Sequence, residues 1–294
     1  MKRKLTAEGA ALTAAAALGL SACTIGDPLT EPETVEVVTV TETSGQAHSP
    51  APRGSDPRPT TDTPGGDLSQ VLQRAVDNAI AAHGGKAAVS IGGESSAGDA
   101  SGFASWSTMK VPVAIAALKE HPELTVEAAN AIQVSDNGAA NILWNSTSPD
   151  AVEAVLAEGA TPVAVQREVT RPGFSAFGQT QWTVAEQARF ASHLGCVAGS
   201  APVLELMGNI AGGQAYGLGT IPGARFKGGW GPSISGAYEV RQFGLVPDSN
   251  GRMIPLAIAA SAADGTYESG QVMLTQLTKE LIPALGTAPG AACA

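Results

Sequence analysis

The chain has 294 residues, a formal net charge of −10 and no cluster of basic residues beyond its first four positions. This acidic balance argues against binding to nucleic acid and against electrostatic attraction to anionic lipid. The four histidines are scattered without metal-ligand spacing, so we expect no metal and no other cofactor.

Residues 1–23 have the pattern of a bacterial lipoprotein signal. A basic start, Met1-Lys2-Arg3-Lys4, precedes an apolar run over 9–20 that is too short to span a bilayer, and the run ends in Leu20-Ser21-Ala22-Cys23. The pattern predicts that Cys23 is diacylated and begins the mature chain, because two acyl chains suffice for stable anchoring. We therefore expect a lipid-anchored protein on the extracytoplasmic face of the cell membrane. An ordinary cleaved signal and a simple anchor are the alternatives.

The following segment, 24–67, is rich in Pro, Thr, Ser, Glu and Asp, with few large apolar residues. Such a composition buries too little surface to offset the entropy of ordering, so we predict a disordered tether. Regular apolar patterns begin at Leu68 and continue to about Leu285. That span of about 220 residues is long enough for one domain with a real core, and we assign 68–294 to it.

Within the domain, the expected elements run from helix and strand, through a block of helices, to a strand meander and a closing helix. The expected helices span 68–83, 107–120, 125–134, 150–158, 184–194 and 269–281, and the expected strands span 87–91, 225–230, 237–246 and 252–260. Thr183 and Glu186 form a capping box, and Pro247 to Gly251 form a hairpin turn. The order predicts an α/β (α+β) domain with an antiparallel sheet bracketed by terminal helices and an inserted all-helical lobe.

The segment Ser107-Thr108-Met109-Lys110 carries the first candidate chemistry. A serine and a lysine three apart occur by chance about once in such a chain, so a helix cap with a solvated charge is the plain interpretation. However, Ser107 lies at a helix start, where free N–H groups favour negative charge. Lys110 lies one turn further on, ahead of the apolar VPVAIAAL, so burial would lower its pKa toward that of a general base for Ser107.

Two further segments contain candidate partners for Ser107 and Lys110. Ser135-Asp136-Asn137 is either a loop with a helix cap, or a proton relay through Ser135 with Asn137 orienting a substrate amide and Asp136 stabilising the loop. Lys227-Gly228-Gly229-Trp230 is either a bulge or turn, or a binding edge where glycine admits a ligand's backbone. In the second interpretation Lys227 is a cation that helps to keep Lys110 neutral, and the Trp230 N–H completes an oxyanion hole with that of Ser107.

S-x-x-K, S-D-N and K-x-G in this order form the motif set of the penicillin-recognising serine enzymes. The flanking text, STMKVPV and SDNGAANILW, resembles the class A β-lactamase branch, and the resemblance extends over about 68–285. It implies a β-lactamase/DD-peptidase-like fold with a five-stranded antiparallel sheet and the site between sheet and helical lobe. It also implies these roles: Ser107 the acylated nucleophile, Lys110 its base, Ser135 the proton shuttle, Asn137 a substrate contact, and Lys227 the carboxylate-binding cation.

Three departures limit what the resemblance implies. Glu168 lies where the family's deacylating glutamate is expected, but the E-x-x-L-N pattern is absent, so Glu168 is alternatively a surface carboxylate paired with Arg167 or Arg171. Gly228 replaces a threonine or serine, and the lost hydrogen bond to a substrate carboxylate costs about 1.5–3 kcal/mol. Only 28 positions separate Ser107 from Ser135, fewer than in the family, so we expect a shorter wall on one side of the cleft and a more open site with altered or relaxed specificity.

Two hypotheses follow. The first is a membrane-anchored serine hydrolase that forms an acyl-enzyme at Ser107 with a β-lactam or a peptidoglycan-like peptide and turns over slowly. The second is a catalytically degenerate lipoprotein of the same fold that binds a cell-wall fragment or a protein partner. In both we expect a monomer, and Cys196 and Cys293 either pair in an oxidising compartment or remain free.

Overall fold

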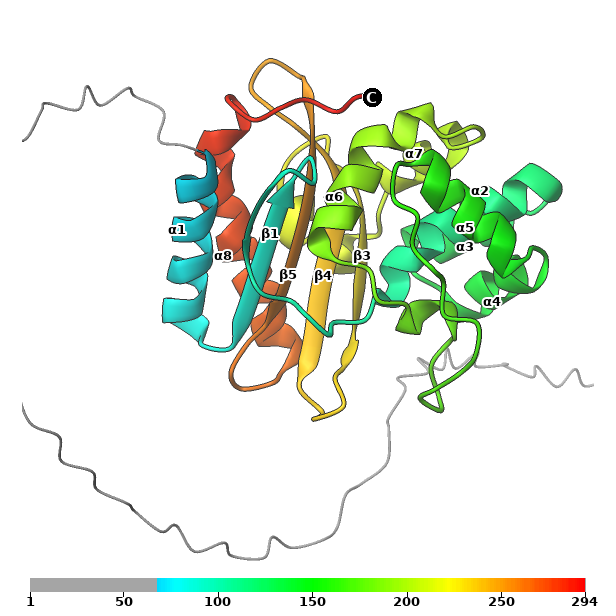
Figure 1. Cartoon of the computed structure of the whole chain (residues 1–294), viewed down its shortest axis with the longest axis horizontal. Helices are drawn as coiled ribbons and strands as arrows, with labels where there is room; N and C mark the ends of the chain where they lie inside the picture. Colours follow the sequence, from blue (N-terminus) through cyan, green and yellow to red (C-terminus); the bar gives the residue numbers. More distant parts are fainter. Residues whose placement is uncertain (1–67, 294) are drawn as a thin grey trace, which may run out of the picture. The chain divides into compact units, whose positions relative to one another are not determined.

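The computed structural model describes residues 68–293, in which helices cover both faces of a five-stranded sheet (Figure 1). The strands are β1 (Lys86–Ile91), β2 (Ser95–Gly98), β3 (Arg225–Pro232), β4 (Tyr238–Pro247) and β5 (Met253–Ser261). They lie in the order β2-β1-β5-β4-β3 and every neighbouring pair is antiparallel, so β3 is an outer strand. The predicted signal with Cys23 and the predicted tether fall outside the described residues.

The two terminal helices, α1 (Leu68–His83) and α8 (Tyr267–Leu285), lie side by side on one face of the sheet (Figure 1). Their apolar residues recur at helical spacing, and Leu72, Val76, Leu274 and Leu277 are buried in one core with Ile258 of β5. Both terminal helices thus pack on the sheet, as the sequence predicted, and both cover the same face of it. Along residues 68–293, none of the helices has the length and apolarity needed to cross a bilayer.

The residues between β2 and β3 form the predicted helical block, drawn in green in Figure 1. Its helices are α2 (Lys110–Glu120), α3 (Thr125–Gln133), α4 (Asn137–Asn145), α5 (Pro149–Glu158), α6 (Val184–His193) and α7 (Ala201–Met207). Helix α6 lies against β1, β4 and β5, while α2 contacts α3, α4, α5 and α7. Helix α2 is buried from Lys110 to Ala117, which makes it the central helix of the lobe.

Most expected elements are present with ends shifted by a few residues, and three were missed. The capping box is confirmed, because Thr183 Oγ1 accepts from the Glu186 N–H at 3.2 Å and the Glu186 carboxylate accepts from the Thr183 N–H at 2.8 Å. Strand β2 was missed because its sequence, SSAG, has no β-branched or aromatic residue. No element was assigned to the residues of α4, although the S-D-N segment before it was a candidate helix cap, and α7 has only seven residues.

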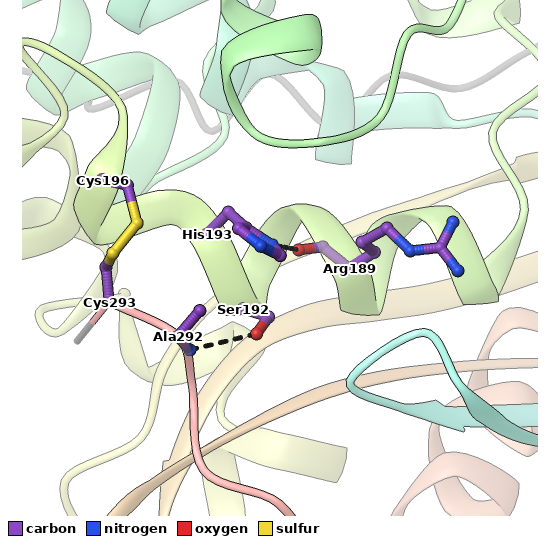
Figure 2. Close-up of a disulfide and its surroundings, with 6 residues drawn as sticks. All are labelled: Arg189, Ser192, His193, Cys196, Ala292 and Cys293. Atoms are coloured by element: carbon purple, nitrogen blue, oxygen red, sulfur yellow. Dashed lines mark hydrogen bonds between the residues drawn. A yellow bond between two sulfur atoms is a disulfide. The ribbon is translucent and has the colours of Figure 1, made fainter.

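Cys196 and Cys293, whose pairing the sequence left open, form a disulfide with a Cα–Cα distance of 5.3 Å. Figure 2 shows that the chain next to Cys293 also follows the end of α6, where the Ala292 N–H donates to Ser192 Oγ at 3.2 Å. The disulfide and this hydrogen bond tie the segment after α8 to the end of α6. The last described residues are therefore part of the packed domain.

Candidate functional site

Ser107 lies in a 3₁₀ turn, Trp106–Met109, that leads directly into α2. The Lys110 N–H donates to the carbonyl oxygen of Ser107, so the two residues are one turn apart. Ser107 is partly exposed, whereas the Lys110 side chain is buried, like the residues that follow it in α2 up to Ala117. Trp106, just before Ser107, has φ of 51°, a left-handed conformation that is strained for a bulky residue and is typical of functional sites.

The ammonium group of Lys110 is held by the S-D-N segment. Lys110 Nζ donates to the Ser135 carbonyl at 2.7 Å and to Asn137 Oδ1 at 2.8 Å, and it lies 3.3 Å from Ser135 Oγ. No hydrogen bond joins Lys110 Nζ to Ser107 Oγ in the described structure, although the sequence predicted that the lysine reaches this hydroxyl. Burial lowers the pKa of Lys110 to about 7, against a smaller opposing effect of Asp136. A lysine with this pKa is substantially neutral near pH 7 and can accept a proton.

The S-D-N segment caps a helix and also contacts Lys110. Asp136 caps α4 by accepting from the Ala139 N–H at 2.6 Å, so the capping interpretation holds for this residue. Ser135 adopts a left-handed backbone with φ of 61°, and its side chain and that of Asn137 both contact Lys110. Since Asn137 Oδ1 accepts from the lysine, its amide nitrogen remains as a donor for a ligand carbonyl.

Lys227 of β3 also contacts the hydroxyl of Ser135, which lies near Lys110. Its Nζ donates to Ser135 Oγ at 2.9 Å and to the Gly228 carbonyl at 2.9 Å, and its side chain is fully buried. Burial, followed by repulsion from Lys110, lowers the pKa of Lys227 well below its ordinary value. For Lys110 the largest cause of the lowered pKa is burial. Ser135 Oγ thus lies between two buried amines.

The strand edge after Lys227 lies directly against the turn that contains Ser107. A Cβ atom built on Gly229 would lie 2.8 Å from Ser107 N and 2.9 Å from Thr108 N, closer than real side chains approach, so glycine is needed there. At Gly228 the nearest atom would be Tyr216 Oη at 3.6 Å, an ordinary contact, so packing does not require a glycine. The ring of Trp230 stacks on Tyr267 at 5.2 Å, and only its backbone is available on the Ser107 side.

Glu168 is not brought into this network. Its side chain is exposed, and within residues 68–293 its carboxylate has neither a hydrogen bond nor an ion pair. Its expected pairing with an arginine is wrong: Arg167 pairs with Asp150 at 2.5 Å, and Arg171 donates to the Pro232 carbonyl at 2.6 Å. The structure therefore does not bring Glu168 together with Ser107, Lys110, Ser135 and Lys227.

Glu239, which was not predicted from the sequence, holds Trp106, the residue before Ser107. This carboxylate is 5% exposed and accepts from Trp106 Nε1 at 2.8 Å and from the Ala104 N–H at 3.0 Å. Burial raises its pKa despite these hydrogen bonds. The available signal was the pair Glu239 and Arg241, two charged residues at alternate positions in a strand whose other residues are uncharged. Among residues 68–293, no three His, Cys, Asp or Glu side chains gather as metal ligands would.

Comparison of the fold with solved structures identifies β-lactamases. No protein-family model matches the sequence, and no curated protein matches it by sequence. The β-lactamase from Sphaerobacter thermophilus superimposes with a TM-score of 0.58 at 20% identity, covering 76% of this chain and 99% of that one. The class A β-lactamase from Mycobacterium abscessus gives 0.58 at 15% identity, with coverages of 73% and 99%. A β-lactamase from Xanthomonas campestris gives 0.56 at 15%, with 74% and 98%. The expected β-lactamase-like fold is therefore confirmed.

Proposed function

We propose that this chain is a cell-envelope serine hydrolase that forms an acyl-enzyme at Ser107 with a β-lactam or a peptidoglycan-like peptide. The observation that carries the proposal is the buried Lys110, whose pKa of about 7 and position one turn after Ser107 suit a general base. Desolvating an amine costs folding free energy, so a lysine buried with a perturbed pKa favours a functional role over a purely structural one.

In the proposed reaction, Ser107 Oγ attacks the carbonyl carbon of the ligand and its proton passes to Lys110 Nζ. The carbon–nitrogen bond then breaks, and the leaving nitrogen takes its proton from Ser135 Oγ, which is replenished from Lys110 across their 3.3 Å contact. The N–H groups of Ser107 and Trp230 stabilise the oxyanion. Lys227, the second amine beside Ser135, binds the ligand carboxylate, and the Asn137 amide nitrogen binds an amide oxygen.

We further propose that the acyl-enzyme is long-lived. Hydrolysis of the ester needs a base that activates water, and the exposed Glu168 carboxylate has no partner that would hold it over Ser107. This argues for slow turnover, which distinguishes the chain from an efficient β-lactamase.

The proposed compartment is the extracytoplasmic face of the membrane, with the chain anchored through a diacylated Cys23 as a monomer. The Cys196–Cys293 disulfide supports export, because such bonds persist in oxidising compartments. Replacing Cys23 by alanine should release the protein from the membrane fraction, and retention of the variant there would refute the anchor.

A non-catalytic ligand-binding protein is the second candidate. It is favoured by Gly228, where packing leaves room for a side chain yet the hydroxyl that would bind a carboxylate is absent. It is also favoured by the Lys110 hydrogen bonds, which point to the S-D-N segment instead of Ser107.

Incubation with a fluorescent penicillin, followed by intact-mass measurement, separates the two. We expect one covalent adduct in the natural protein and in Ser249→Ala, an exposed hairpin serine, and no adduct in Ser107→Ala. Absence of an adduct in the natural protein would favour the binding protein. An adduct that decays within seconds and is trapped by Glu168→Gln would refute slow turnover.

A further inference from the structure

The outer edge of β3 is occupied at two places by side chains. In an antiparallel strand, alternate residues direct both N–H and C=O away from the partner strand. On β3 the Gly228 carbonyl accepts from Lys227 Nζ at 2.9 Å, and the Pro232 carbonyl accepts from Arg171 Nη2 at 2.6 Å. Trp230 lies midway between these two residues, so its N–H and C=O face the same open side. A ligand that lies along β3 can therefore pair with Trp230 but finds the Pro232 carbonyl already taken.

Arg171 is firmly held where it binds Pro232. Its guanidinium stacks over the rings of Trp106 at 5.4 Å and Phe174 at 4.9 Å, and these two rings contact each other edge to face at 5.3 Å. Trp106 in turn presses on Gly231, where a Cβ would lie 2.4 Å from its ring, and donates to Glu239. Arg171, Trp106 and Phe174 thus form a packed block that joins the 170–175 loop to the end of β3, next to Ser107.

We infer that Arg171 determines specificity by closing the β3 edge beyond Trp230, so that the site accepts acyl groups with a small side chain and excludes bulky ones. The inference rests on the proposed acyl transfer at Ser107. A ligand whose carbonyl is held by the N–H groups of Ser107 and Trp230 can extend from that carbonyl in two directions along β3. In a penicillin the carboxylate and the acyl side chain lie on opposite sides of this carbonyl. Because the carboxylate is drawn to Lys227, the side chain must extend toward Pro232 and meet the block.

The test compares acylation rates for two probes, 6-aminopenicillanic acid, which has no acyl side chain, and benzylpenicillin, which has a phenylacetyl group. Intact mass spectrometry over time gives the second-order rate constant for each. The natural protein should prefer the smaller probe, and Arg171→Ala should shift the rate ratio toward benzylpenicillin by about tenfold or more. Arg167→Ala is the matched control, because this loop arginine pairs with Asp150 and Glu153 outside the block; its ratio should equal that of the natural protein.

Phe174→Ala, which opens the block while keeping Arg171, provides a second variant if Arg171→Ala does not fold, and it should shift the ratio in the same direction. If acylation occurs but neither variant changes the ratio, the inference is wrong and the proposed function stands. A shift of equal size in Arg167→Ala would also overturn it, since general loosening of the loop would then be the cause. If neither probe acylates the natural protein, the proposed function itself fails.

Discussion

Replacing Gly229 by alanine tests whether β3 positions the nucleophile. The added Cβ would lie 2.8 Å from Ser107 N, 2.9 Å from Thr108 N and 3.0 Å from the Ser105 carbonyl oxygen. All three neighbours are backbone atoms, so the strand and the turn must separate by roughly 0.5–1 Å, at an overpacking cost of about 1–3 kcal/mol. In a domain of this size that cost lowers Tm by roughly 2–12 °C. A misplacement of this order at a reacting centre slows acylation by about 100-fold.

Gly228→Ala is the matched control, because its Cβ would meet nothing closer than 3.6 Å. We expect its Tm to change by about 2 °C or less and its acylation rate to stay close to that of the natural protein. Tm is followed by circular dichroism, and acylation by intact mass with a penicillin. A Gly229→Ala variant that is as stable and as reactive as Gly228→Ala would refute the claim that the strand presses on the nucleophile turn.

The remaining predictions concern pH and the disulfide. Because the neutral form of Lys110 accepts the proton and its pKa is lowered to about 7, the acylation rate should fall as pH drops below about 7 and level off above it; a flat profile between pH 5.5 and 8.5 would contradict its role as base. Replacing both Cys196 and Cys293 by serine should lower the free energy of unfolding by about 2–5 kcal/mol and Tm on the order of 10 °C, and a reductant should destabilise the natural protein but not the variant.

Helices and strands were predictable from the sequence wherever apolar residues alternate, as in a strand, or recur at helical spacing. Helix α1 and the three-stranded meander of β3, β4 and β5 follow such patterns, and Thr183 with Glu186 marked the start of α6. Strand β2 carries no such signal, because its serines, alanine and glycine are strand residues only through their pairing with β1. Pairing between segments distant in sequence is a tertiary property that local propensity does not encode.

The residues of the site were predictable from the sequence, but the arrangement of their side chains was predictable only in part. Ser107, Lys110, Ser135, Asn137, Lys227 and Gly229 all came from three short motifs, and the structure brings them together. The direction of the Lys110 ammonium group was not predictable, because four acceptors of the S-D-N segment surround it only after α4 packs on α2. The exposed position of Glu168 and the support of Trp106 by Glu239 depend in the same way on contacts between distant elements.

The occupied edge of β3 also bears on self-association. An outer strand with open N–H and C=O groups is a template on which a second copy can add a strand. Lys227 and Arg171 take up the Gly228 and Pro232 carbonyls, Pro232 has no N–H to offer, and the turn at Ser107 lies against Gly229. Between Gly228 and Pro232, only Trp230 keeps both its N–H and its C=O open, so this end of β3 offers little for a second strand to pair with. The same side chains that border a ligand's path therefore hinder a second copy of this protein from pairing along this end of β3.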